Sequence, residues 1–259
     1  MSEEDSGLLW GRRPVLEALR SGRTVERVLI ARELAPSGIV GDIRRRAEAA
    51  GVPVRLVPKT EIVKAAGQVN HQGVAAVTAA FRYAPLDRLL ASPDPRLLFL
   101  DGVTDPHNLG SLLRSADGAG FGGVVLPARR SAGVTGAVRR VSAGAAEVVP
   151  VARVNSLGAA LEQAKKAGLW IVGLDGAADD DLWTTPLAEP PVGLVLGAED
   201  RGISKGIAAR CDALVRIPSA GRISSLNVAV AGAIAMYEVS RRERIRVLSA
   251  PATGGTDVT

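Results

Sequence analysis

Three short polar stretches hold the residues of this chain that could act on a substrate, and each follows an apolar run. The runs end at Asp101, Leu196 and Ile217, and the polar stretches continue as Gly-Val-Thr-Asp-Pro-His-Asn-Leu-Gly-Ser-Leu-Leu-Arg114, Gly-Ala-Glu-Asp-Arg-Gly-Ile203 and Pro-Ser-Ala-Gly-Arg-Ile-Ser-Ser-Leu-Asn227. They offer amide, hydroxyl, carboxylate and guanidinium groups. Such groups bind and orient polar reactants, and a carboxylate can also accept a proton. This set favours a site that orients polar reactants over one that forms a covalent intermediate.

The chain has few groups for other kinds of catalysis. It contains two histidines and one cysteine, so a zinc site or a histidine-containing triad would have almost no ligands. No Walker phosphate loop is present, and no Gly-x-Gly-x-x-Gly follows a first strand. We expect His71, which lies beside Gly73, to be a turn or surface residue. The single Cys211 excludes an internal disulfide.

Charge and composition are compatible with a nucleic-acid partner. The 259 residues carry a formal net charge of +5, and the isoelectric point is near 9.9. Basic surface attracts phosphate, although an Arg- and Ala-rich composition also follows from GC-rich coding. Three Phe, three Trp and two Tyr are too few for an aromatic platform that binds single strands. No apolar run reaches the ~18 residues of a membrane helix, and the acidic start lacks the basic region of a secretion signal, so we expect a cytoplasmic protein.

The elements that must carry the three stretches follow an alternating α/β pattern. Strands are predicted at 97–101, 123–126, 147–151, 169–174, 192–196 and 213–217, with helices at 108–119, 134–142 and 156–167. Strands that alternate with helices form a parallel sheet covered on both faces. Ligands of such sheets bind outside the carboxyl ends of the strands. The three polar stretches should therefore meet on one rim.

A long helix is predicted after the third stretch. Ile217 should end the strand before it, because Pro218 cannot continue a paired strand. Ser224 could cap the helix with its hydroxyl, and Ala and Gly residues beyond it allow close packing against other backbone. Folding alone does not explain the polar Asn227 at the start of an otherwise apolar helix.

The chain is expected to divide into two domains. A small α/β domain is predicted over 1–80, with 1–7 flexible, followed by a proline-containing linker at 81–95. The larger domain occupies 96–246, and the polar tail at 247–259 is expected to be disordered. A helix over 38–50 carries three arginines, which either contact RNA or form an ordinary solvated face: Arg44, Arg45 and Arg46.

In their order and spacing, the three stretches resemble the motifs of the SpoU (TrmH) family of RNA ribose methyltransferases, within the SPOUT superfamily. The likeness extends through 11–19, 71–75 and 141–150 and is greatest to the RlmB subgroup, which methylates a guanosine ribose in the P loop of 23S ribosomal RNA. The resemblance implies an α/β fold with a deep trefoil knot in the C-terminal domain, S-adenosyl-L-methionine as methyl donor, and a homodimer whose site is completed across the interface. The N-terminal domain resembles small ribosomal RNA-binding α/β domains, which makes it the expected RNA substrate-binding domain.

The resemblance also assigns roles to residues of the three stretches. Arg114 is expected to clamp a phosphate near the ribose hydroxyl rather than to act as a base, because a guanidinium stays protonated; an ordinary salt bridge, to Asp117 or to a partner subunit, is the alternative. Glu199 could orient Arg114, accept a proton or cap a helix. Asn227 is expected to position the substrate ribose or Glu199, with hydrogen bonding in the first helical turn as the alternative. The expected catalytic residues are Asn108, Arg114, Glu199 and Asn227, and the expected cofactor-binding residues are Leu196, Gly197, Ile217, Pro218, Ser225 and Leu226.

Two classes of function remain open at this point. The first is methyl transfer to a guanosine ribose in 23S rRNA, with a tRNA or an antibiotic-resistance site in rRNA as other targets of the same chemistry. The second is an RNA-binding assembly factor that kept the fold without catalysis. The joint presence of the amide, carboxylate and guanidinium residues favours the enzyme. No metal is expected.

Overall fold

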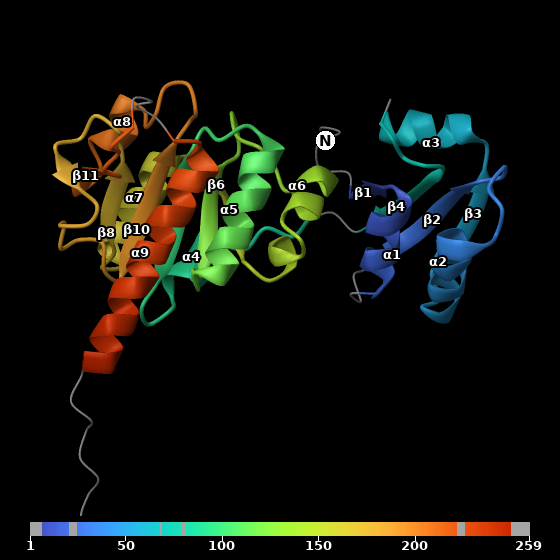
Figure 1. Ribbon diagram of the computed structural model, residues 1–259, viewed down its shortest axis with the longest axis horizontal. Coiled ribbons are helices and arrows are strands. Elements are labelled where there is room, and N and C mark those ends of the chain that lie inside the picture. The colour runs from blue at the N-terminus through green and yellow to red at the C-terminus, as the bar shows by residue number, and fades with distance from the viewer. Residues whose placement is uncertain (1–6, 21–24, 68, 79–80, 222–225, 250–259) are drawn as a thin grey trace, which may run out of the picture. The chain divides into compact units, whose positions relative to one another are not determined.

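The computed structural model describes residues 7–20, 25–67, 69–78, 81–221 and 226–249. These residues form two compact units. The first unit contains the described residues up to Arg82 together with the later segment Ala132–Gly144, and the second contains Tyr83–Ser131 and the described residues from Ala145 onward. Figure 1 labels most of the helices and strands of both units.

The first unit is built on a mixed sheet with the strand order β1-β4-β2-β3. β4 pairs antiparallel with β1 and with β2, whereas β2 and β3 are parallel. The strands are β1 (Leu8–Trp10), β2 (Val25–Ala31), β3 (Val54–Val57) and β4 (Val74–Thr78); the helices are α1 (Arg12–Arg20), α2 (Gly38–Ala49), α3 (Lys59–Ala66) and α6 (Gly136–Val141).

Helices cover both faces of this sheet. Val15 of α1 and Ile43 of α2 are fully buried in one apolar cluster, and Ile62 of α3 is fully buried in another. α6 comes from the later part of the chain and packs closely on β1, because a Cβ added to Gly136 would lie 2.4 Å from the carbonyl oxygen of Leu8. Arg139 of the same helix is buried and donates to the Thr78 hydroxyl at 3.2 Å.

The second unit is built on a seven-stranded sheet with the order β7-β6-β5-β10-β8-β11-β9, and all of its strand pairs are parallel. The strands are β5 (Arg96–Asp101), β6 (Gly123–Pro127), β7 (Val151–Val154), β8 (Trp170–Leu174), β9 (Asp180–Asp181), β10 (Val192–Gly197) and β11 (Ala213–Arg216). The helices are α4 (Leu86–Leu90), α5 (Pro106–Gly118), α7 (Leu157–Lys166), α8 (Lys205–Ala208) and α9 (Val228–Ser249). The parallel sheet predicted from the alternation of strands and helices is confirmed.

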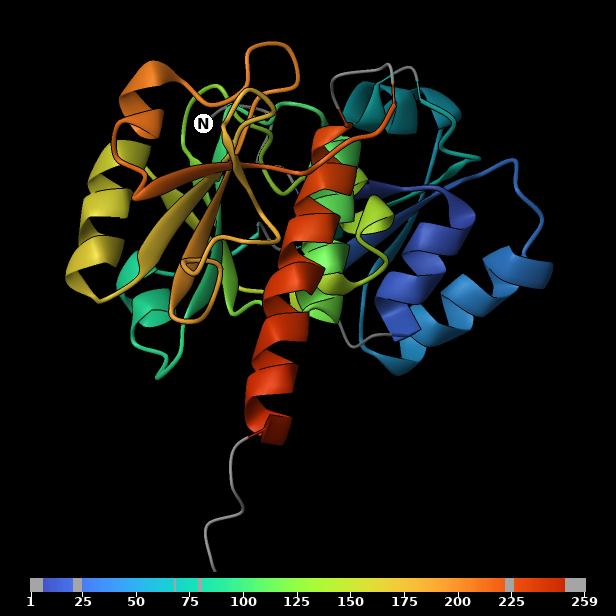
Figure 2. The ribbon, with the colours of Figure 1, turned by 60° about the vertical axis from the view of Figure 1, so that its left-hand side comes forward.

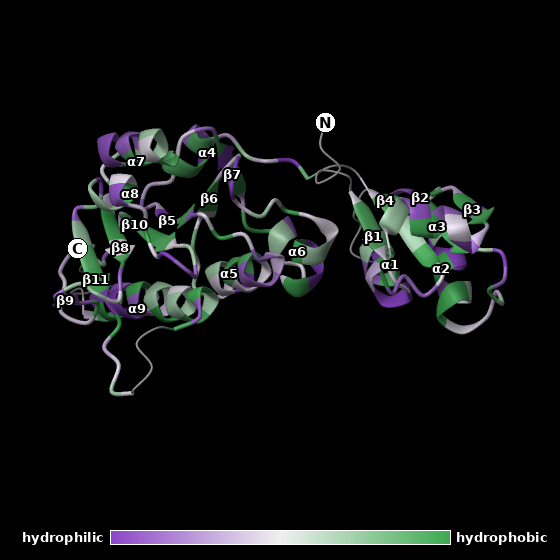
Figure 3. Cartoon of the chain, turned by 90° about the horizontal axis from the view of Figure 1, so that it is seen from above, coloured by the Kyte–Doolittle hydropathy of each residue, from purple (hydrophilic) through white to green (hydrophobic). Residues whose placement is uncertain are grey.

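Two layers of helices sandwich this sheet. Figure 3 shows α4 and α7 on one side of it and α5 and α9 on the other. Figure 2 shows α9 running alongside α5. The contact between these helices depends on a small residue, because a Cβ added to Gly232 would lie 2.4 Å from Leu112 and 2.6 Å from Leu196. Close packing at this small residue is therefore present, but against leucine side chains rather than against other backbone as predicted.

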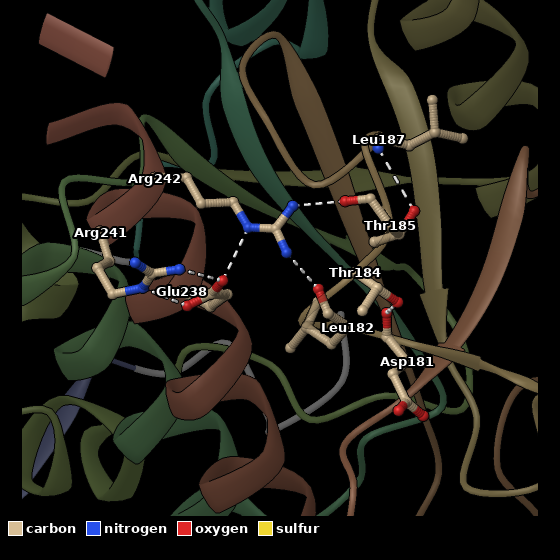
Figure 4. A network of polar contacts seen from close by, with 8 residues as sticks. All are labelled: Asp181, Leu182, Thr184, Thr185, Leu187, Glu238, Arg241 and Arg242. Atoms are coloured by element: carbon tan, nitrogen blue, oxygen red, sulfur yellow. Dashed lines mark hydrogen bonds and ion pairs between the residues drawn. The ribbon is translucent and has the colours of Figure 1, made fainter. Parts of the chain in front are cut away.

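A polar network fastens α9 to the segment after β9 (Figure 4). Glu238 is buried and accepts hydrogen bonds from Arg241 at 2.7 Å and from Arg242 at 2.8 Å. Arg242 also donates to the carbonyl oxygens of Leu182, at 2.6 Å, and Thr185. Bonding to the two guanidinium groups, that of Arg241 first, holds the pKa of Glu238 below its usual value.

The structure corrects the prediction of a strand at 147–151. Residues 145–147 form a turn of 3-10 helix instead, and β7 begins at Val151. Pro150 has no amide hydrogen to donate to a ladder, and its carbonyl oxygen accepts from Val124 at 3.0 Å, so the strand starts after it. Val148, predicted to lie inside a strand, is 69% exposed.

Three boundaries near the C-terminus also differ from the predictions. β11 ends at Arg216, one residue before Ile217. α9 begins at Val228 rather than after Ser224, which lies outside the described residues. α9 also continues to Ser249, three residues into the range expected to be a tail, and 250–259 lie outside the described residues. Within the described part of the chain, no helix is both long and apolar enough to span a membrane.

Candidate active site

The polar site lies at the carboxyl ends of the strands in the second unit. β5 and β10 are neighbours in the sheet, and their last residues, Asp101 and Gly197, are partners in the register. β11, which leads into the third polar stretch, pairs with β8 on the far side of β10. All three strands point the same way, so the three polar stretches leave the sheet at the same edge.

Asn108 joins the three stretches through its side chain. Its Nδ2 donates to Oε1 of Glu199 at 2.5 Å, and its Oδ1 accepts from Nδ2 of Asn227 at 3.0 Å. Asn108 is buried, with 9% of its surface exposed, whereas Glu199 is exposed. The expectation that the three stretches meet on one rim is thereby confirmed, and Asn108 is the residue at which they meet.

Asn227 caps the helix that follows it. Its Oδ1 accepts from the amides of Ala229 at 2.9 Å and Val230 at 3.2 Å, which are unpaired donors of the first turn of α9. The amide nitrogen of the same side chain is left to hold Asn108. The first-turn hydrogen bonding that was the alternative role for Asn227 is therefore present, and Asn227 is the helix cap that was predicted at Ser224. It also belongs to the polar cluster, where it reaches Glu199 through Asn108.

The start of α5 fixes where Asn108 lies. Pro106 occupies the first turn and Oδ1 of Asp105 accepts from the amide of His107 at 2.9 Å, a usual way to begin a helix. Gly102 precedes this turn with a φ of +89°, which few other residues adopt. Asn108 is thus held near the N-terminal end of α5, directly above the end of β5.

Asp101 and Ser204 form a second link across the rim, which the sequence did not indicate. Oδ2 of Asp101 accepts from the backbone amide of Ser204 at 2.7 Å. This bond ties the end of β5 to Ser204, the residue that precedes α8. The amide of Ser204 therefore bonds to Asp101 and not to Glu199, so the possible helix-capping role of Glu199 is not observed among the described residues. The one sequence signal for it was the position of Asp101 as the last residue of an apolar strand.

Gly197 is required by the protein's own backbone. A Cβ at this position would lie 2.0 Å from the carbonyl carbon of Gly202 and 2.2 Å from the amide nitrogen of Ile203. The chain folds back here, since Ala198 and Gly202 exchange backbone hydrogen bonds of 2.9 and 3.1 Å. Leu196, just before it, is buried. Glycine is therefore needed here for the turn that ends the strand, and the expected contact between Gly197 and the cofactor stays a prediction.

The remaining predicted cofactor residues differ in exposure. Ile217 is half-buried, Pro218 is exposed, and Leu226 is 46% exposed although it is a large apolar residue. Leu226 lies one residue before the cap Asn227, so it stands at the rim. Ser225 lies outside the described residues.

Arg114 is not brought into the cluster by its own chain. It is exposed on α5, six residues after Asn108, which places it roughly 120° around the helix from Asn108. Among the described residues it has neither a hydrogen bond nor an ion pair, so the alternative of a salt bridge to Asp117 is not observed. Nor does Glu199 orient Arg114 within the chain.

The other singled-out residues belong to different parts of the molecule. Arg44, Arg45 and Arg46 are exposed on α2 in the first unit, and Arg45 pairs with Asp42. His71, also in the first unit, is a turn residue as expected, but it is buried, with 4% of its surface exposed. Across the described residues, no group of His, Cys, Asp and Glu could hold a metal ion.

Fold and site together define a two-unit α/β protein whose larger unit carries a polar cluster on the carboxyl rim of a parallel sheet. The chain matches the family described as "SpoU rRNA Methylase family" over residues 95–237. It also matches the family described as "RNA 2'-O ribose methyltransferase substrate binding" over residues 8–84. The chain therefore belongs to the SpoU family of RNA methyltransferases.

Individual relatives support this assignment over almost the whole chain. The Bacillus subtilis protein YacO, which carries the provisional name of a TrmH family tRNA/rRNA methyltransferase, is 39% identical over 90% of this chain and 94% of its own length. The SpoU methyltransferase AviRb from Streptomyces viridochromogenes, solved with AdoMet, has a TM-score of 0.76 at 28% identity and covers 93% of this chain and 91% of its own. An AdoMet-bound rRNA methyltransferase from Sinorhizobium meliloti has a TM-score of 0.69 at 30% identity, over 92% and 88%.

Proposed function

We propose that this protein transfers a methyl group from S-adenosyl-L-methionine to the ribose 2′-hydroxyl of a guanosine in 23S rRNA. The observation that carries the proposal is the hydrogen-bonded cluster of Asn108, Glu199 and Asn227 on the rim of a SpoU-family sheet. The ribose as acceptor is supported by the family that matches residues 8–84. The guanosine in the P loop of 23S rRNA rests on the resemblance to the RlmB subgroup.

The residues at the rim fit S-adenosyl-L-methionine. Leu226 and the half-buried Ile217 offer apolar surface to an adenine, and the backbone at Leu196 and Gly197 ends β10 at the same edge of the sheet. Two similar proteins hold this cofactor in their solved structures. When bound, the cofactor supplies an electrophilic methyl carbon.

Glu199 is proposed to accept the proton of the ribose hydroxyl. Its carboxylate is exposed, and Asn108 fixes one of its oxygens, while the other has no partner among the described residues. A proton acceptor must be held within hydrogen-bond reach of the hydroxyl. Asn227 contributes by holding Asn108, so the two amides act as positioning residues for the carboxylate.

Arg114 is proposed to bind a phosphate of the RNA next to the target ribose. A guanidinium pairs with phosphate in a bidentate manner and stabilises negative charge that develops nearby. Because Arg114 makes no ion pair or hydrogen bond with the described residues of its own chain, we propose that the protein acts as a homodimer in which Arg114 of one chain completes the site of the other. The trefoil knot implied by the family resemblance stays part of this proposal.

The test is incubation of the purified protein with radiolabelled S-adenosyl-L-methionine and RNA that lacks modifications, with 23S rRNA and total tRNA in separate reactions. Label is expected in 23S rRNA, and mapping of ribose methylation should place it on a guanosine. Label in tRNA alone would show that the substrate is tRNA and that the reaction is still methyl transfer. Absence of label from both RNAs, with tight binding of cofactor and RNA, would support the non-catalytic assembly factor instead.

A further inference from the structure

A cleft of about 1630 Å³ lies in the first unit. Residues that follow β1, the turn before β4 and α6 contribute to its walls. Five basic side chains and two carboxylates line it, and one of the carboxylates, Glu17, is already paired with Arg20 at 2.6 Å. The cleft therefore carries a positive potential, which favours a phosphate-containing ligand.

The arginines at this cleft are arranged to meet an anion. Nε of Arg12 donates to the carbonyl oxygen of Gln72 at 3.2 Å, while the two terminal nitrogens of that guanidinium have no hydrogen bond among the described residues. Arg13 next to it is exposed. The guanidinium of Arg140 lies over the half-buried ring of Trp10, with 5.1 Å from its carbon to the ring centroid. Stacked aromatic and guanidinium planes are surfaces on which unpaired RNA bases stack.

His71 supplies a polar side chain at the cleft, and one of its two ring nitrogens is already hydrogen-bonded. Its Nδ1 accepts a hydrogen bond from the amide of Gly73 at 2.9 Å, so in the neutral ring the proton is on Nε2. That second nitrogen has no partner among the described residues, although only 4% of the surface of the residue is exposed. A donor held in this way can bond to the edge of a base.

The wall that carries these groups is preformed. Gln72 and Gly73 both have positive φ, at 51° and 75°, and form a tight turn. Backbone bonds tie this turn to its neighbours, from Gly11 to Val74 at 2.9 Å and from Ala31 to Gly73 at 2.8 Å. Little ordering is then needed when a ligand binds, which reduces the entropic cost of binding.

The volume of the cleft favours a polymer over a small ligand. Pockets for small molecules usually enclose about 300–1,000 Å³, which is less than the volume found here. An RNA duplex presents mostly phosphates and 2′-hydroxyls, whereas loops and single strands present bases that can stack and form hydrogen bonds. A cleft that combines cations, one aromatic stack and an unpaired histidine donor suits the second kind of RNA.

We propose that this cleft binds a single-stranded segment of the RNA substrate, with phosphates at Arg12 and Arg13, a base against the Trp10–Arg140 stack, and a base edge bonded to Nε2 of His71. The assignment rests on the proposed function in so far as the substrate is RNA. It extends the RNA-binding surface beyond residues 8–84, because Arg140 comes from the middle of the chain. It also places the principal contact away from the arginines of α2, which do not line the cleft.

The test compares two double variants that each remove two exposed positive charges from the first unit. Arg13→Ala/Arg140→Ala alters the cleft, and Arg44→Ala/Arg46→Ala is the matched control on α2. The affinity of the full-length protein for an unstructured RNA oligonucleotide, and for the same sequence as a duplex, is measured by fluorescence anisotropy at several salt concentrations. Thermal unfolding shows that each variant is folded.

The cleft variant is expected to bind the single strand about tenfold or more weakly, and its salt dependence should be shallower by about one unit, because phosphate contacts are lost. The control should stay within about threefold of the wild type. Equal losses in both variants, a loss in the control alone, or equal wild-type affinity for duplex and single strand would overturn the proposal. Methyl transfer by the wild type is measured separately, so a protein that binds RNA through the cleft and transfers no methyl group contradicts the proposed function and leaves the cleft assignment standing.

Discussion

At the scale of single residues, Asn108 decides the geometry of the site, because it bonds to both Glu199 and Asn227. In an Asn108→Asp variant a carboxylate oxygen would replace the donor that faces Glu199. The two negative charges would repel each other, and the proton acceptor would be displaced.

We expect methyl transfer by Asn108→Asp to fall by about 10²–10³-fold, a range typical for loss of one fixed polar contact in an active site. Single-turnover assays with saturating RNA and cofactor measure this rate. A midpoint of thermal unfolding close to that of the wild type would show that the variant is folded. A folded variant with the wild-type rate would contradict the positioning role of Asn108.

Cys211 gives a second prediction at this scale. Burial raises the pKa of its thiol to about 11, despite the opposing charge of Lys165. The thiolate is the reactive form, so iodoacetamide should alkylate the native protein slowly at pH 8 and faster only as the pH approaches 11. Mass spectrometry measures the fraction of alkylated protein over time, and the modified residue is known because Cys211 is the only cysteine. The urea-unfolded protein is the control and should react readily at pH 8; equal rates in both states would contradict the prediction.

At the scale of elements, the polar network that joins α9 to the segment after β9 depends on the charge of Glu238, which holds Arg242 in place. Its pKa in the folded protein is lowered by Arg241 and Arg242. The stabilisation is therefore complete above the pKa of the unfolded chain, which is about 4.3, and is lost as the pH falls through the lower folded value. Glu238→Gln should reduce the free energy of unfolding by about 1–3 kcal/mol at neutral pH.

Denaturant titrations at pH 7 and pH 3 check this prediction. The difference between wild type and Glu238→Gln should shrink at the lower pH, because pH 3 lies below the pKa of this carboxyl in the unfolded chain and proton binding then favours the unfolded state. Arg242→Ala should destabilise more than Arg241→Ala, because Arg242 is the less exposed of the two and also bonds to Leu182 and Thr185. A pH-independent difference would show that the charge of Glu238 contributes nothing.

Alternation of apolar runs and helices was sufficient to predict the parallel sheet and the edge at which the polar stretches meet. The strand predicted at 147–151 was wrong because Pro150 has no amide hydrogen for the sheet, and β7 begins only at Val151. Local patterns also failed where two residues competed for one role, since Ser224 and Asn227 are both good helix caps. The partners of distant residues, such as Ser204 for Asp101 or the backbone of Gly202 for Gly197, could not be predicted from a single sequence because these pairings form only when the sheet is assembled.

At the scale of the whole molecule, the proposed exchange of Arg114 between chains can be tested by complementation. Arg114→Ala and Glu199→Gln should each abolish most methyl transfer on their own. If Arg114 acts across the interface, a mixed dimer of the two variants contains one site with both residues intact. Activity should then return when the variants are co-expressed or unfolded and refolded together.

The same experiment distinguishes a site that uses Arg114 of its own chain. If Arg114 serves the site of its own chain, every site in the mixed dimer lacks one residue, and co-refolding restores no activity. The control is each variant refolded alone under the same conditions. Analytical ultracentrifugation of the wild type shows whether the protein is dimeric at the concentration used.

The contribution of Ala132–Gly144 to the first unit has a consequence for biosynthesis. Residues 83–131, which belong to the second unit, must be synthesised before this segment leaves the ribosome. At ordinary translation speeds this takes roughly 2–10 s, and during that time the surface of β1 that α6 later covers has no α6 to pack on. The nascent first unit is therefore expected to be open to chaperones or to its RNA before it is complete, and a fragment expressed without residues 132–144 would remain at that stage.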